Sequence, residues 1–280
     1  MLKNIEELKE KAKYIRKEVL DMCVKAGTGH VNSAFSSVEL VVALFYAGIL
    51  CFDPKNPGWK DRDRFILSKG QASVLLYPIL ADLGYFPREE LDKFTKADGI
   101  FGVHLQHDVP GAEITSGSLG QGFGIAAGIA LAAKMDRELF MTFALLGDGE
   151  CYEGSIWETA LFASHNRLNN LVAIVDRNHL CVTDFTENVI ALEPMEEKWR
   201  SFGWETTSID GHSFEEILKS LKGFRSRKSS RPLVIIADTR KGKGVEFLSD
   251  APLWHGVAPK NHEADKAKEE LNNYDHELQF

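Results

Sequence analysis

Two groups of side chains that could bind a metal ion each follow a short apolar run in this sequence. The run 140–146 leads to Asp148, which lies between two glycines, and the run 171–175 leads to Asn178. The intervening segment 154–165 has apolar residues on one side, as an amphipathic helix does. A strand–helix–strand unit makes its two strands parallel, so their carboxyl ends share one edge of the sheet. We therefore expect Asp148 and Asn178 to lie side by side, although thirty positions (178 − 148) separate them.

A carboxylate and an amide oxygen on glycine-bounded turns suit a hard cation such as Mg²⁺. This ion takes oxygen ligands and completes its octahedron with phosphate oxygens of a substrate or cofactor. Gly147 and Gly149 allow the backbone to approach a diphosphate, because neither residue carries a Cβ atom. The Gly-Asp-Gly triplet alone would more often only cap an ordinary helix, but its pairing with Asn178 favours a metal–diphosphate site.

The residues around these two turns resemble the thiamine diphosphate motif of the transketolase family. The similar segments are GDGECYEGSIWE at 147–158, VDRNHL at 175–180 and IDGHSFEEI at 209–217. The resemblance implies that Asp148, Asn178 and the carbonyl oxygen of Leu180 bind Mg²⁺, or Ca²⁺ or Mn²⁺, which in turn holds thiamine diphosphate. It covers nearly all 280 residues, but it corresponds only to the N-terminal half of a full-length transketolase. We therefore expect the N-terminal subunit of a split transketolase.

The same resemblance implies which residues contact the cofactor. The segment SGSLGQG at 116–122 is similar to the transketolase loop whose backbone meets the aminopyrimidine ring. As a G-x-x-G-x-G run it could also indicate a nucleotide site, but it lacks the preceding strand and the later acidic residue that such a site needs. By the resemblance, Glu153 belongs to an acidic network that links paired active sites. The implied cofactor contacts are Gly117, Ser118, Leu119, Gly147, Gly149, Glu150, Glu153, Asn178 and His255.

Three histidines and one glutamine match places where transketolases contact the substrate. His30 in a glycine-rich turn and His255 in Trp-His-Gly resemble histidines that reach the substrate, and His255 also resembles one that reaches the cofactor diphosphate. His104 is a better match than His107 to the family's Gly-His-Pro histidine, although its neighbours differ from that motif. Imidazoles suit proton transfer near neutral pH. The resemblance thus assigns His30, His104 and His255 to catalysis, with Gln71 in a fourth catalytic position.

Two of these places depart from the family's pattern. The family commonly has Gly-His-Pro-Gly where this chain has Gly-His-Val-Asn at 29–32. The segment DRFILSKG at 63–70 is a specific match, but the next residue is normally histidine and here it is Gln71. A glutamine amide donates and accepts hydrogen bonds but does not titrate near neutral pH. Either Gln71 adapts the pocket to an unusual ketose, or it is neutral drift at a structural contact.

Other candidate groups carry weaker signals. Lys241 and Lys243 lie among glycines and could meet an anion, although a K-G-K-G run is usually a mobile loop. His104 and His107 could bind zinc, but no third ligand of matching spacing lies nearby. Cys151 beside the metal turn is not expected to act as a nucleophile.

The resemblance implies an activity and a partner. The activity is transfer of a two-carbon unit from a ketose to an aldose, in which the cofactor carries the hard chemistry. In this family the pyrimidine-binding domain supplies the glutamate that activates the cofactor. We therefore expect a separate C-terminal transketolase subunit, two copies of each chain, and sugar or sugar-phosphate substrates. The alternatives are an alpha-type subunit of a 2-oxo-acid dehydrogenase and a cofactor-binding homologue without catalysis. The residues do not identify the ketose or show whether it carries phosphate.

Composition limits the remaining classes of function. Lys and Arg total 33 against 41 Asp and Glu, so the net charge is −8, which argues against a nucleic-acid partner. The four cysteines show no C-x-x-C spacing and are expected as reduced thiols of a cytoplasmic protein. No apolar run approaches the roughly 20 residues that span a bilayer, and the charged N-terminal helix has no signal-peptide core, so no membrane partner is expected.

The alternation of expected strands and helices predicts the fold. It favours a doubly wound α/β domain with a mostly parallel sheet and helices on both faces, formed by residues 1–280 as one domain. Ser213 is expected to cap a helix ending at Leu221, with Glu216 completing a capping box. Strands are expected at 64–67, 140–146, 171–175, 204–209 and 232–237, and helices at 2–25, 31–50, 72–83, 87–94, 154–165, 194–202, 213–221 and from 262 onward. The segment 115–133 is expected to be a glycine-rich turn followed by a helix of Gly and Ala.

Overall fold

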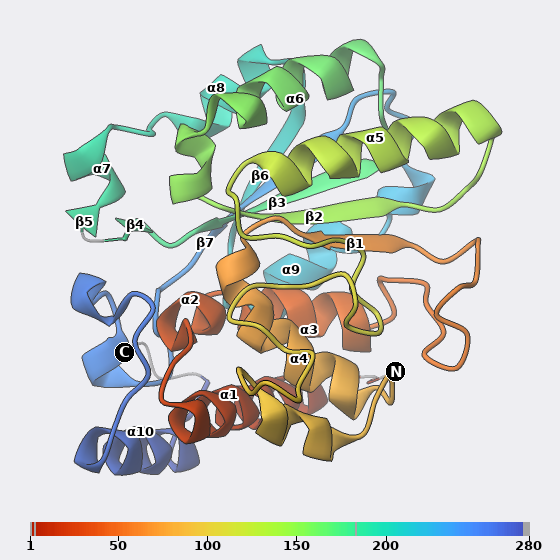
Figure 1. Ribbon diagram of the computed structural model, residues 1–280. Helices are drawn as coiled ribbons and strands as arrows, with labels where there is room; N and C mark the ends of the chain where they lie inside the picture. Colours follow the sequence, from red (N-terminus) through yellow and green to blue (C-terminus); the bar gives the residue numbers. More distant parts are fainter. Residues whose placement is uncertain (1, 3, 183, 277–280) are drawn as a thin grey trace.

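A sheet of five parallel strands runs through the described part of the chain (Figure 1). The computed structural model describes residues 2, 4–182 and 184–276. The strand order is β1–β2–β3–β7–β6. Because parallel strands share the direction of their carboxyl ends, β1, β2, β3 and β7 all end at one edge. The strands span β1 Arg64–Leu67, β2 Thr142–Gly147, β3 Leu171–Arg177, β6 Glu205–Asp210 and β7 Leu233–Asp238.

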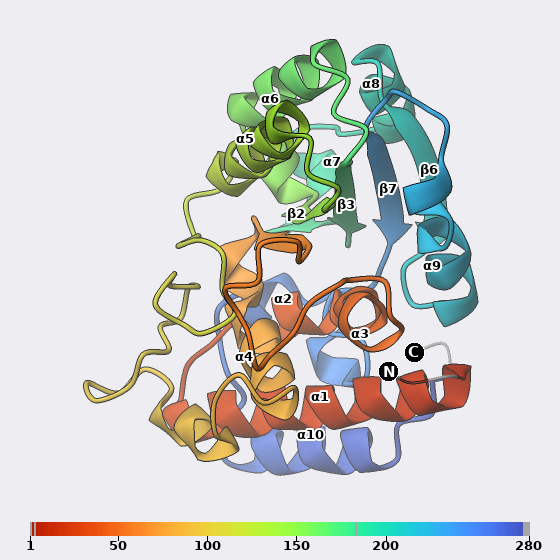
Figure 2. The ribbon, with the colours of Figure 1, turned by 90° about the vertical axis from the view of Figure 1, so that its right-hand side faces the viewer.

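Helices cover both faces of this sheet (Figure 2). One face packs against α5 (Gln121–Asp136), α6 (Gly154–His165) and α8 (Met195–Ser201). The other face packs against α1 (Ile5–Ala26), α2 (Val31–Phe35), α3 (Val38–Tyr46), α4 (Ser73–Asp82) and α9 (Phe214–Leu221), while α10 (His262–Asn272) lies against α1. The predicted doubly wound α/β class is therefore confirmed.

Shorter elements connect these layers. The hairpin of β4 (Leu180–Cys181) and β5 (Asp184–Phe185) follows β3, and α7 (Thr186–Val189) follows the hairpin. The 3-10 helices are η1 Gly70–Ala72, η2 Arg88–Lys93, η3 Gly149–Tyr152, η4 Phe224–Ser226, η5 Glu246–Leu248 and η6 Pro252–Trp254. Among the described residues, no helix combines the length and the apolar character needed to cross a bilayer.

Side chains of the strands alternate between the two helical layers. In β2, Phe143 and Leu145 join the core on the α1–α4 side, whereas Ala144 and Leu146 join the core on the α5–α6 side. All four side chains are buried. Burial on both faces explains why the strand sequences read as continuous apolar runs rather than as alternating patterns.

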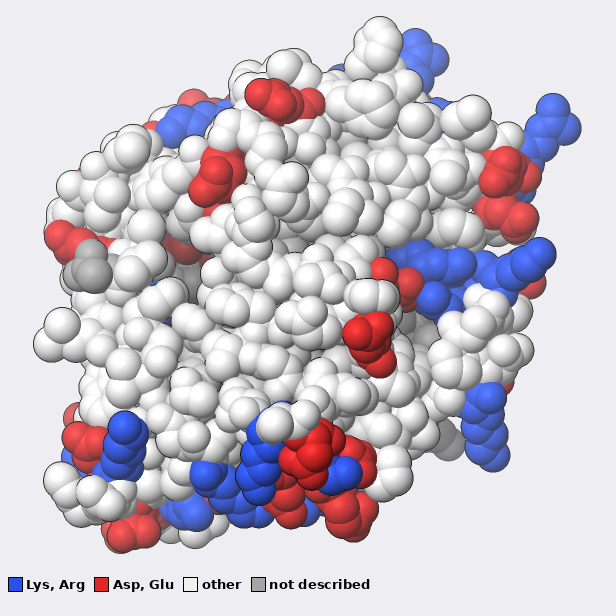
Figure 3. Space-filling view, viewed as in Figure 1, with Lys and Arg blue, Asp and Glu red and all other residues white. Residues whose placement is uncertain are grey.

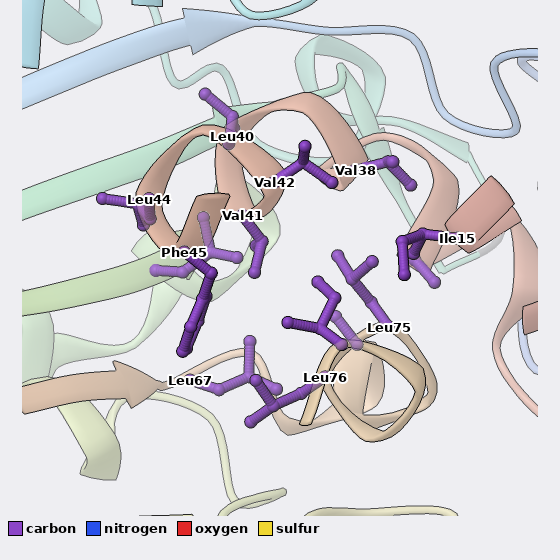
Figure 4. Packing of buried hydrophobic residues seen from close by; sticks show 14 of the residues in the cluster. Ile15, Val38, Leu40, Val41, Val42, Leu44, Phe45, Leu67, Leu75 and Leu76 are labelled. Atoms are coloured by element: carbon purple, nitrogen blue, oxygen red, sulfur yellow. The ribbon is translucent and has the colours of Figure 1, made fainter. Parts of the chain in front are cut away.

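The α3 helix lies at the centre of the larger core. In Figure 4, Val41 and Phe45 of α3 lie towards Leu67 of β1 and Leu76 of α4. Every residue of α3 is buried, as expected for a helix that is apolar all round. Glu39 is the charged exception, and its carboxylate pairs with Arg16 of α1, both side chains being fully buried.

On the opposite face, small residues let α5 lie close to the sheet. Its buried positions are mainly Gly and Ala, and the large side chain among them is Phe123. The ring of Phe123 lies 5.9 Å from that of Trp199 and 5.7 Å from that of Trp204. These three aromatic side chains fill the space between α5, α8 and the start of β6, and so hold the α5 layer in place.

The helix predicted for 31–50 is in fact two helices. α2 ends at Phe35 and α3 begins at Val38. The hydroxyls of Ser36 and Ser37 between them donate to Asp176 Oδ2 at 2.6 and 2.8 Å. Serine side chains can draw the backbone out of a helix when a better partner lies nearby, and here the partner is a buried carboxylate.

Other local predictions differ in detail. The polar helix predicted for 87–94 is the 3-10 helix η2, and the one predicted for 72–83 starts with η1 before α4 begins. Ser213 Oγ caps α9 by accepting from Glu216 N. Glu216, however, accepts from Asp210 N at 2.9 Å, so it closes the turn after β6 instead of completing a capping box.

Candidate active site

A pocket lies beyond the carboxyl ends of β1, β2 and β3, where ligands bind in doubly wound sheets. We call it the sheet-edge pocket. It brings together side chains and turns from the two predicted metal turns, the turn after β1, and the loop after β7. Its lining residues are Ser33, Lys69, Gln71, Leu119, Gly147, Asp148, Gly149, Glu150, Asn178, Leu180, Cys181, Val182, Lys241 and His255.

The two predicted metal turns do lie side by side. Gly147 pairs with Asp176 across β2 and β3, so the residues that follow each strand are neighbours. Asp148 Oδ2 accepts the His179 N–H at 2.6 Å, and Asn178 Oδ1 accepts the Leu180 N–H at 3.2 Å. A carboxylate, an amide oxygen and the start of β4 thus meet in one wall of the pocket.

Asp148 is buried beside a second acid. Burial raises the pKa of its carboxyl, and the nearby charge of Asp176 raises it further, whereas Arg177 lowers it. Arg177 donates to Asp148 Oδ2 at 3.1 Å. Burial and the charge of Asp176 thus oppose the anionic form of Asp148, and a bound cation would stabilise that form.

Lys241 is a buried cation beside this wall. Its Nζ lies 3.5 Å from Leu180 O and 3.3 Å from His255 Nδ1, both uncharged partners. Burial lowers the pKa of the lysine to about 8, and the neighbouring Lys69 acts in the same direction. A lysine in this setting favours an anion within the pocket. The residues present therefore fit a diphosphate together with a divalent cation.

Asp176 and Lys69 form a buried ion pair that the sequence pattern did not predict. Lys69 Nζ donates to Asp176 Oδ2, and Thr239 Oγ1 donates to Asp176 Oδ1. Burial acts to raise the pKa of Asp176, but Lys69 outweighs it and holds the value at about 2. The signal available in the sequence was Lys69 itself, which lies on a glycine turn directly after a predicted strand.

Glu150 lines the pocket and connects three segments around it. Its Oε1 accepts from Ser68 Oγ at 2.5 Å and from Gly120 N at 2.8 Å, and its Oε2 accepts from Gly147 N at 3.1 Å. These contacts join the end of β1, the start of α5 and the end of β2. Glu150 therefore shapes the pocket by holding its glycine turns together.

The three predicted catalytic histidines form a cluster. The ring of His30 lies 5.7 Å from that of His104 and 5.1 Å from that of His255. His107 lies outside the cluster, because its exposed ring contacts Thr115 and Asp108. Of these two histidines, His104 is therefore the one that lies beside His30.

Two histidines of this cluster, His30 and His255, are neutral near pH 7. Burial lowers the pKa of His30 to about 4, and His255, His104, Lys241 and Lys69 act in the same direction. The pKa of His255 is likewise lowered to about 4, by burial and then by Lys241 and Lys69. Within the described residues, His30 Nδ1 is buried and has no hydrogen-bond partner, so it can accept from or donate to a ligand.

Gln71 also presents an unused polar atom. It lines the sheet-edge pocket from η1, and its Oε1 is buried with no hydrogen-bond partner in the described part of the chain. An unpaired buried acceptor costs free energy, so such atoms mark places where a ligand or water completes the bonding.

Three of the predicted cofactor contacts do not line the pocket: Gly117, Ser118 and Glu153. Glu153 is exposed and precedes α6. Gly117 packs against the turn after β1, since a Cβ atom on Gly70 would lie 2.6 Å from Gly117 N. Gly117 also lies close to His104, because a Cβ atom on Gly117 would lie 3.1 Å from the His104 ring. The loop around Gly117 therefore positions His104, whereas Leu119 lines the pocket.

The fold and the pocket define an α/β protein with a pocket suited to an anionic ligand beyond the carboxyl ends of a parallel sheet. Residues 8–280 match the family described as transketolase, thiamine diphosphate binding domain. The chain belongs to the transketolase family and is a thiamine diphosphate-binding subunit of transferase type, which confirms the resemblance noted in the sequence.

The relatives of this chain include single subunits and longer proteins. The chain is 42% identical over 252 residues to the 6-deoxy-6-sulfo-D-fructose transketolase subunit SqwG of Clostridium sp., covering 90% of this chain and 91% of that protein. It is 35% identical over 268 residues to one subunit of the apulose-4-phosphate transketolase of Phocaeicola vulgatus, covering 96% and 95%. The crystal structure of Campylobacter jejuni transketolase aligns with a TM-score of 0.89 at 33% identity, covering 99% of this chain but 44% of that one. The chain thus corresponds in length to single subunits and to part of the longer enzyme.

The lowered pKa of His30 predicts how stability depends on pH. Because the folded pKa, about 4, lies below the ordinary value of 6.5, the unfolded chain binds the proton more readily between these values. The free energy of unfolding should therefore rise with pH across this window, and His30→Gln should reduce that slope by up to one proton. Urea unfolding at a series of pH values measures it, with exposed His107→Gln as the matched control. Equal slopes for His30→Gln and the unaltered chain would contradict the prediction.

Proposed function

We propose that this chain, together with a separate C-terminal subunit, transfers a two-carbon ketol unit from a ketose to an aldose. The transfer uses thiamine diphosphate held through Mg²⁺, or through Ca²⁺ or Mn²⁺. The observation that carries the proposal is the sheet-edge pocket, in which oxygen ligands lie beside a buried lysine, and the lysine contacts a cluster of histidines. Membership of the transketolase family supports it.

The metal and the diphosphate would share the oxygen-rich wall. Asp148, Asn178 and the carbonyl oxygen of Leu180 are the proposed metal ligands, since hard cations take such oxygens. Lys241 offers the diphosphate a buried positive charge, and Gly147 and Gly149 expose backbone to it. Glu150 keeps these turns in place, and Leu119 contacts the organic part of the cofactor. Gly117 and Ser118 stay in the proposal as the loop that approaches the cofactor.

The histidines act on the sugar. Thiamine diphosphate, when bound, supplies the carbanion and the electron sink that breaking a bond beside a carbonyl requires. A neutral imidazole can accept a proton at one ring nitrogen and donate from the other. We assign His30, His104 and His255 to holding and deprotonating the sugar hydroxyls, and Gln71 to holding an oxygen that does not change its protonation.

The names of the two split relatives indicate the class of donor. One is named for 6-deoxy-6-sulfo-D-fructose and the other for apulose-4-phosphate, both ketoses with an anionic group. We propose that the donor here is also a ketose that carries a sulfonate or phosphate at the end away from the reacting carbons.

An uncharged surface around α5 supports the proposed partner. Ile125, Met135 and Leu161 are 43%, 73% and 58% exposed, and the face that α5 occupies carries few charged residues at its centre (Figure 3). Gly124 and Gly128 lie in this helix without positive φ or a close neighbour that would exclude a side chain. Glycine lowers helix stability by about 1 kcal/mol relative to alanine. Close approach of another chain therefore explains these two glycines better than packing within this chain does.

We further propose two copies of each subunit in the complex. Glu153 lies exposed at the start of α6, and a Cβ atom on Gly120 before α5 would lie 2.8 Å from its Cβ atom, so it borders this uncharged surface. That position suits its predicted place in a network between paired sites. Residues 1–280 are proposed to act as one diphosphate-binding domain. The four cysteines without C-x-x-C spacing support a cytoplasmic location.

The sequence leaves two alternatives to this function open. The transketolase family match favours transketolase over an alpha-type subunit of a 2-oxo-acid dehydrogenase. A cofactor-binding homologue without catalysis is separated from an enzyme by turnover of the reconstituted complex.

Asp148→Ala should abolish metal binding and thiamine diphosphate binding together, because the carboxylate neutralises a cation that also holds the diphosphate. Calorimetry on the assembled complex, with Mg²⁺ present and absent, measures both. The matched control is Asp98→Ala in an exposed loop. Unchanged cofactor affinity in Asp148→Ala would remove the metal assignment.

The purified chain alone should show no transketolase turnover, because the activating glutamate is expected from the partner. Addition of the C-terminal subunit should restore activity. Ile125→Glu and Leu161→Glu should weaken that reconstitution without lowering the free energy of unfolding of the single chain, since both side chains are exposed. Steady turnover by the single chain would refute the proposed partnership.

Gln71→Ala should lower kcat/KM for the native donor, because a hydrogen bond is lost. The expected loss of transition-state stabilisation is roughly 1–3 kcal/mol. Gln71→His should keep the fold and shift preference towards ordinary ketose phosphates. Parallel kinetics on a sulfonated ketose, a ketose phosphate and an uncharged ketose measure the effect. A Gln71→Ala enzyme that matches the unaltered enzyme on every donor would leave only neutral drift.

A further inference from the structure

The loop that carries Lys241 is held by polar residues outside the sheet-edge pocket. This loop, 239–245, follows β7 and contains Gly242 and Gly244, both with positive φ. A Gly-rich segment of this kind has many accessible conformations when nothing holds it. The position of the Lys241 side chain therefore depends on what contacts the backbone on either side of it.

Three backbone groups near Lys241 form hydrogen bonds with residues outside the loop. The Arg240 N–H donates to His212 Nε2 at 2.8 Å, and the Gly242 N–H donates to Asn32 O at 3.0 Å. The carbonyl oxygen of Lys243 accepts from Arg16 Nε at 2.9 Å. The contacts thus fix the residues before and after Lys241, and two of the three partners are charged or titratable side chains.

Those two side chains belong to one buried unit. Arg16 NH1 donates to Glu39 Oε1 at 2.6 Å, and Arg16 NH2 donates to Glu39 Oε2 at 2.9 Å. His212 Nδ1 lies 2.9 Å from Glu39 Oε2. Arg16 and Glu39 are fully buried. Burial acts to raise the pKa of Glu39, but Arg16 outweighs it and, with His212, holds that pKa well below its usual range.

The contacts also determine which nitrogen of His212 carries the proton. An amide N–H can only donate, so His212 Nε2 must accept from Arg240 and is unprotonated. Nδ1 then carries the hydrogen and donates it to the Glu39 carboxylate. Glu39 orients the ring in the way that a carboxylate behind a metal-binding histidine fixes the tautomer of that histidine.

We propose that the Arg16–Glu39–His212 unit positions Lys241 for the anionic group of the cofactor. The unit touches neither cofactor nor substrate, so its members are positioning residues. Arg16 and His212 hold the loop on both sides of the lysine, and Glu39 holds Arg16 and His212. The inference rests on the proposed function for the role of Lys241, but the geometry that holds the loop stands independently of it.

A matched pair of variants separates contact with the loop from contact with Glu39. His212→Gln places an amide oxygen where Nε2 lies, so it can still accept from Arg240 N–H. His212→Asn keeps a donor near the place of Nδ1 but is too short to reach the loop. We expect hydrogen exchange of the peptide 239–245 to quicken in His212→Asn and to stay near the unaltered rate in His212→Gln.

Calorimetry with thiamine diphosphate and Mg²⁺ on the complete complex tests the link to Lys241. His212→Asn should weaken binding by about fivefold to tenfold, the loss expected for one hydrogen bond, whereas His212→Gln should stay within about twofold of the unaltered complex. In a Lys241→Ala background the effect of His212→Asn should disappear, because the residue that it positions is gone. An undiminished effect in that background, or equal effects of the Asn and Gln variants, would overturn the proposal.

The unaltered protein supplies a readout that does not depend on the folding of any variant. The ¹⁵N chemical shifts of the His212 ring should show an unprotonated Nε2 and a protonated Nδ1. A protonated Nε2 would overturn the assigned contact with Arg240. If the complex binds no thiamine diphosphate at all, the proposed function fails, while the exchange and ¹⁵N measurements still decide whether His212 holds the loop.

Discussion

The buried carboxylate of Asp176 is the interaction on which the site depends. It lies near the end of β3, and it receives hydrogen bonds from Ser36 and Ser37 between α2 and α3, from Lys69 after β1 and from Thr239 after β7. Removing one partner of a buried ion pair typically costs about 3–5 kcal/mol, because the other charge is left uncompensated. Asp176 thus fixes the relative positions of the segments that line the sheet-edge pocket, and it also adds negative charge beside Asp148.

This arrangement leaves charges of both signs incompletely compensated inside the pocket. Asp176 and Lys69 satisfy each other, whereas Asp148 depends on Arg177 and backbone N–H groups, and the partners of Lys241 among the described residues are uncharged. Burial opposes ionisation of both Asp148 and Lys241. A cation together with a diphosphate would relieve both at once.

The sequence predicted the parts of this structure that depend on local pattern. The apolar runs and the turns after them placed Asp148 and Asn178 together, since parallel strands meet at one edge, and the limits of α6 and β1 agreed. It could not predict that Ser36 and Ser37 interrupt a helix, because their partner Asp176 lies about 140 residues away. Long separation in sequence likewise concealed the Lys69–Asp176 pair and the Arg16–Glu39–His212 unit. Contacts of this kind follow from the assembled fold, not from the spacing of residues.

Burial is the main reason why two histidines of the cluster are neutral near pH 7. It lowers the pKa values of His30 and His255 to about 4, and the charges of Lys241 and Lys69 act in the same direction. For His30, the neighbouring His255 and His104 contribute more than the two lysines. A neutral imidazole can accept a proton at one ring nitrogen and donate from the other, whereas the amide of Gln71 does not titrate. The site therefore combines histidines that are able to exchange a proton with one polar group that can only hold an oxygen atom.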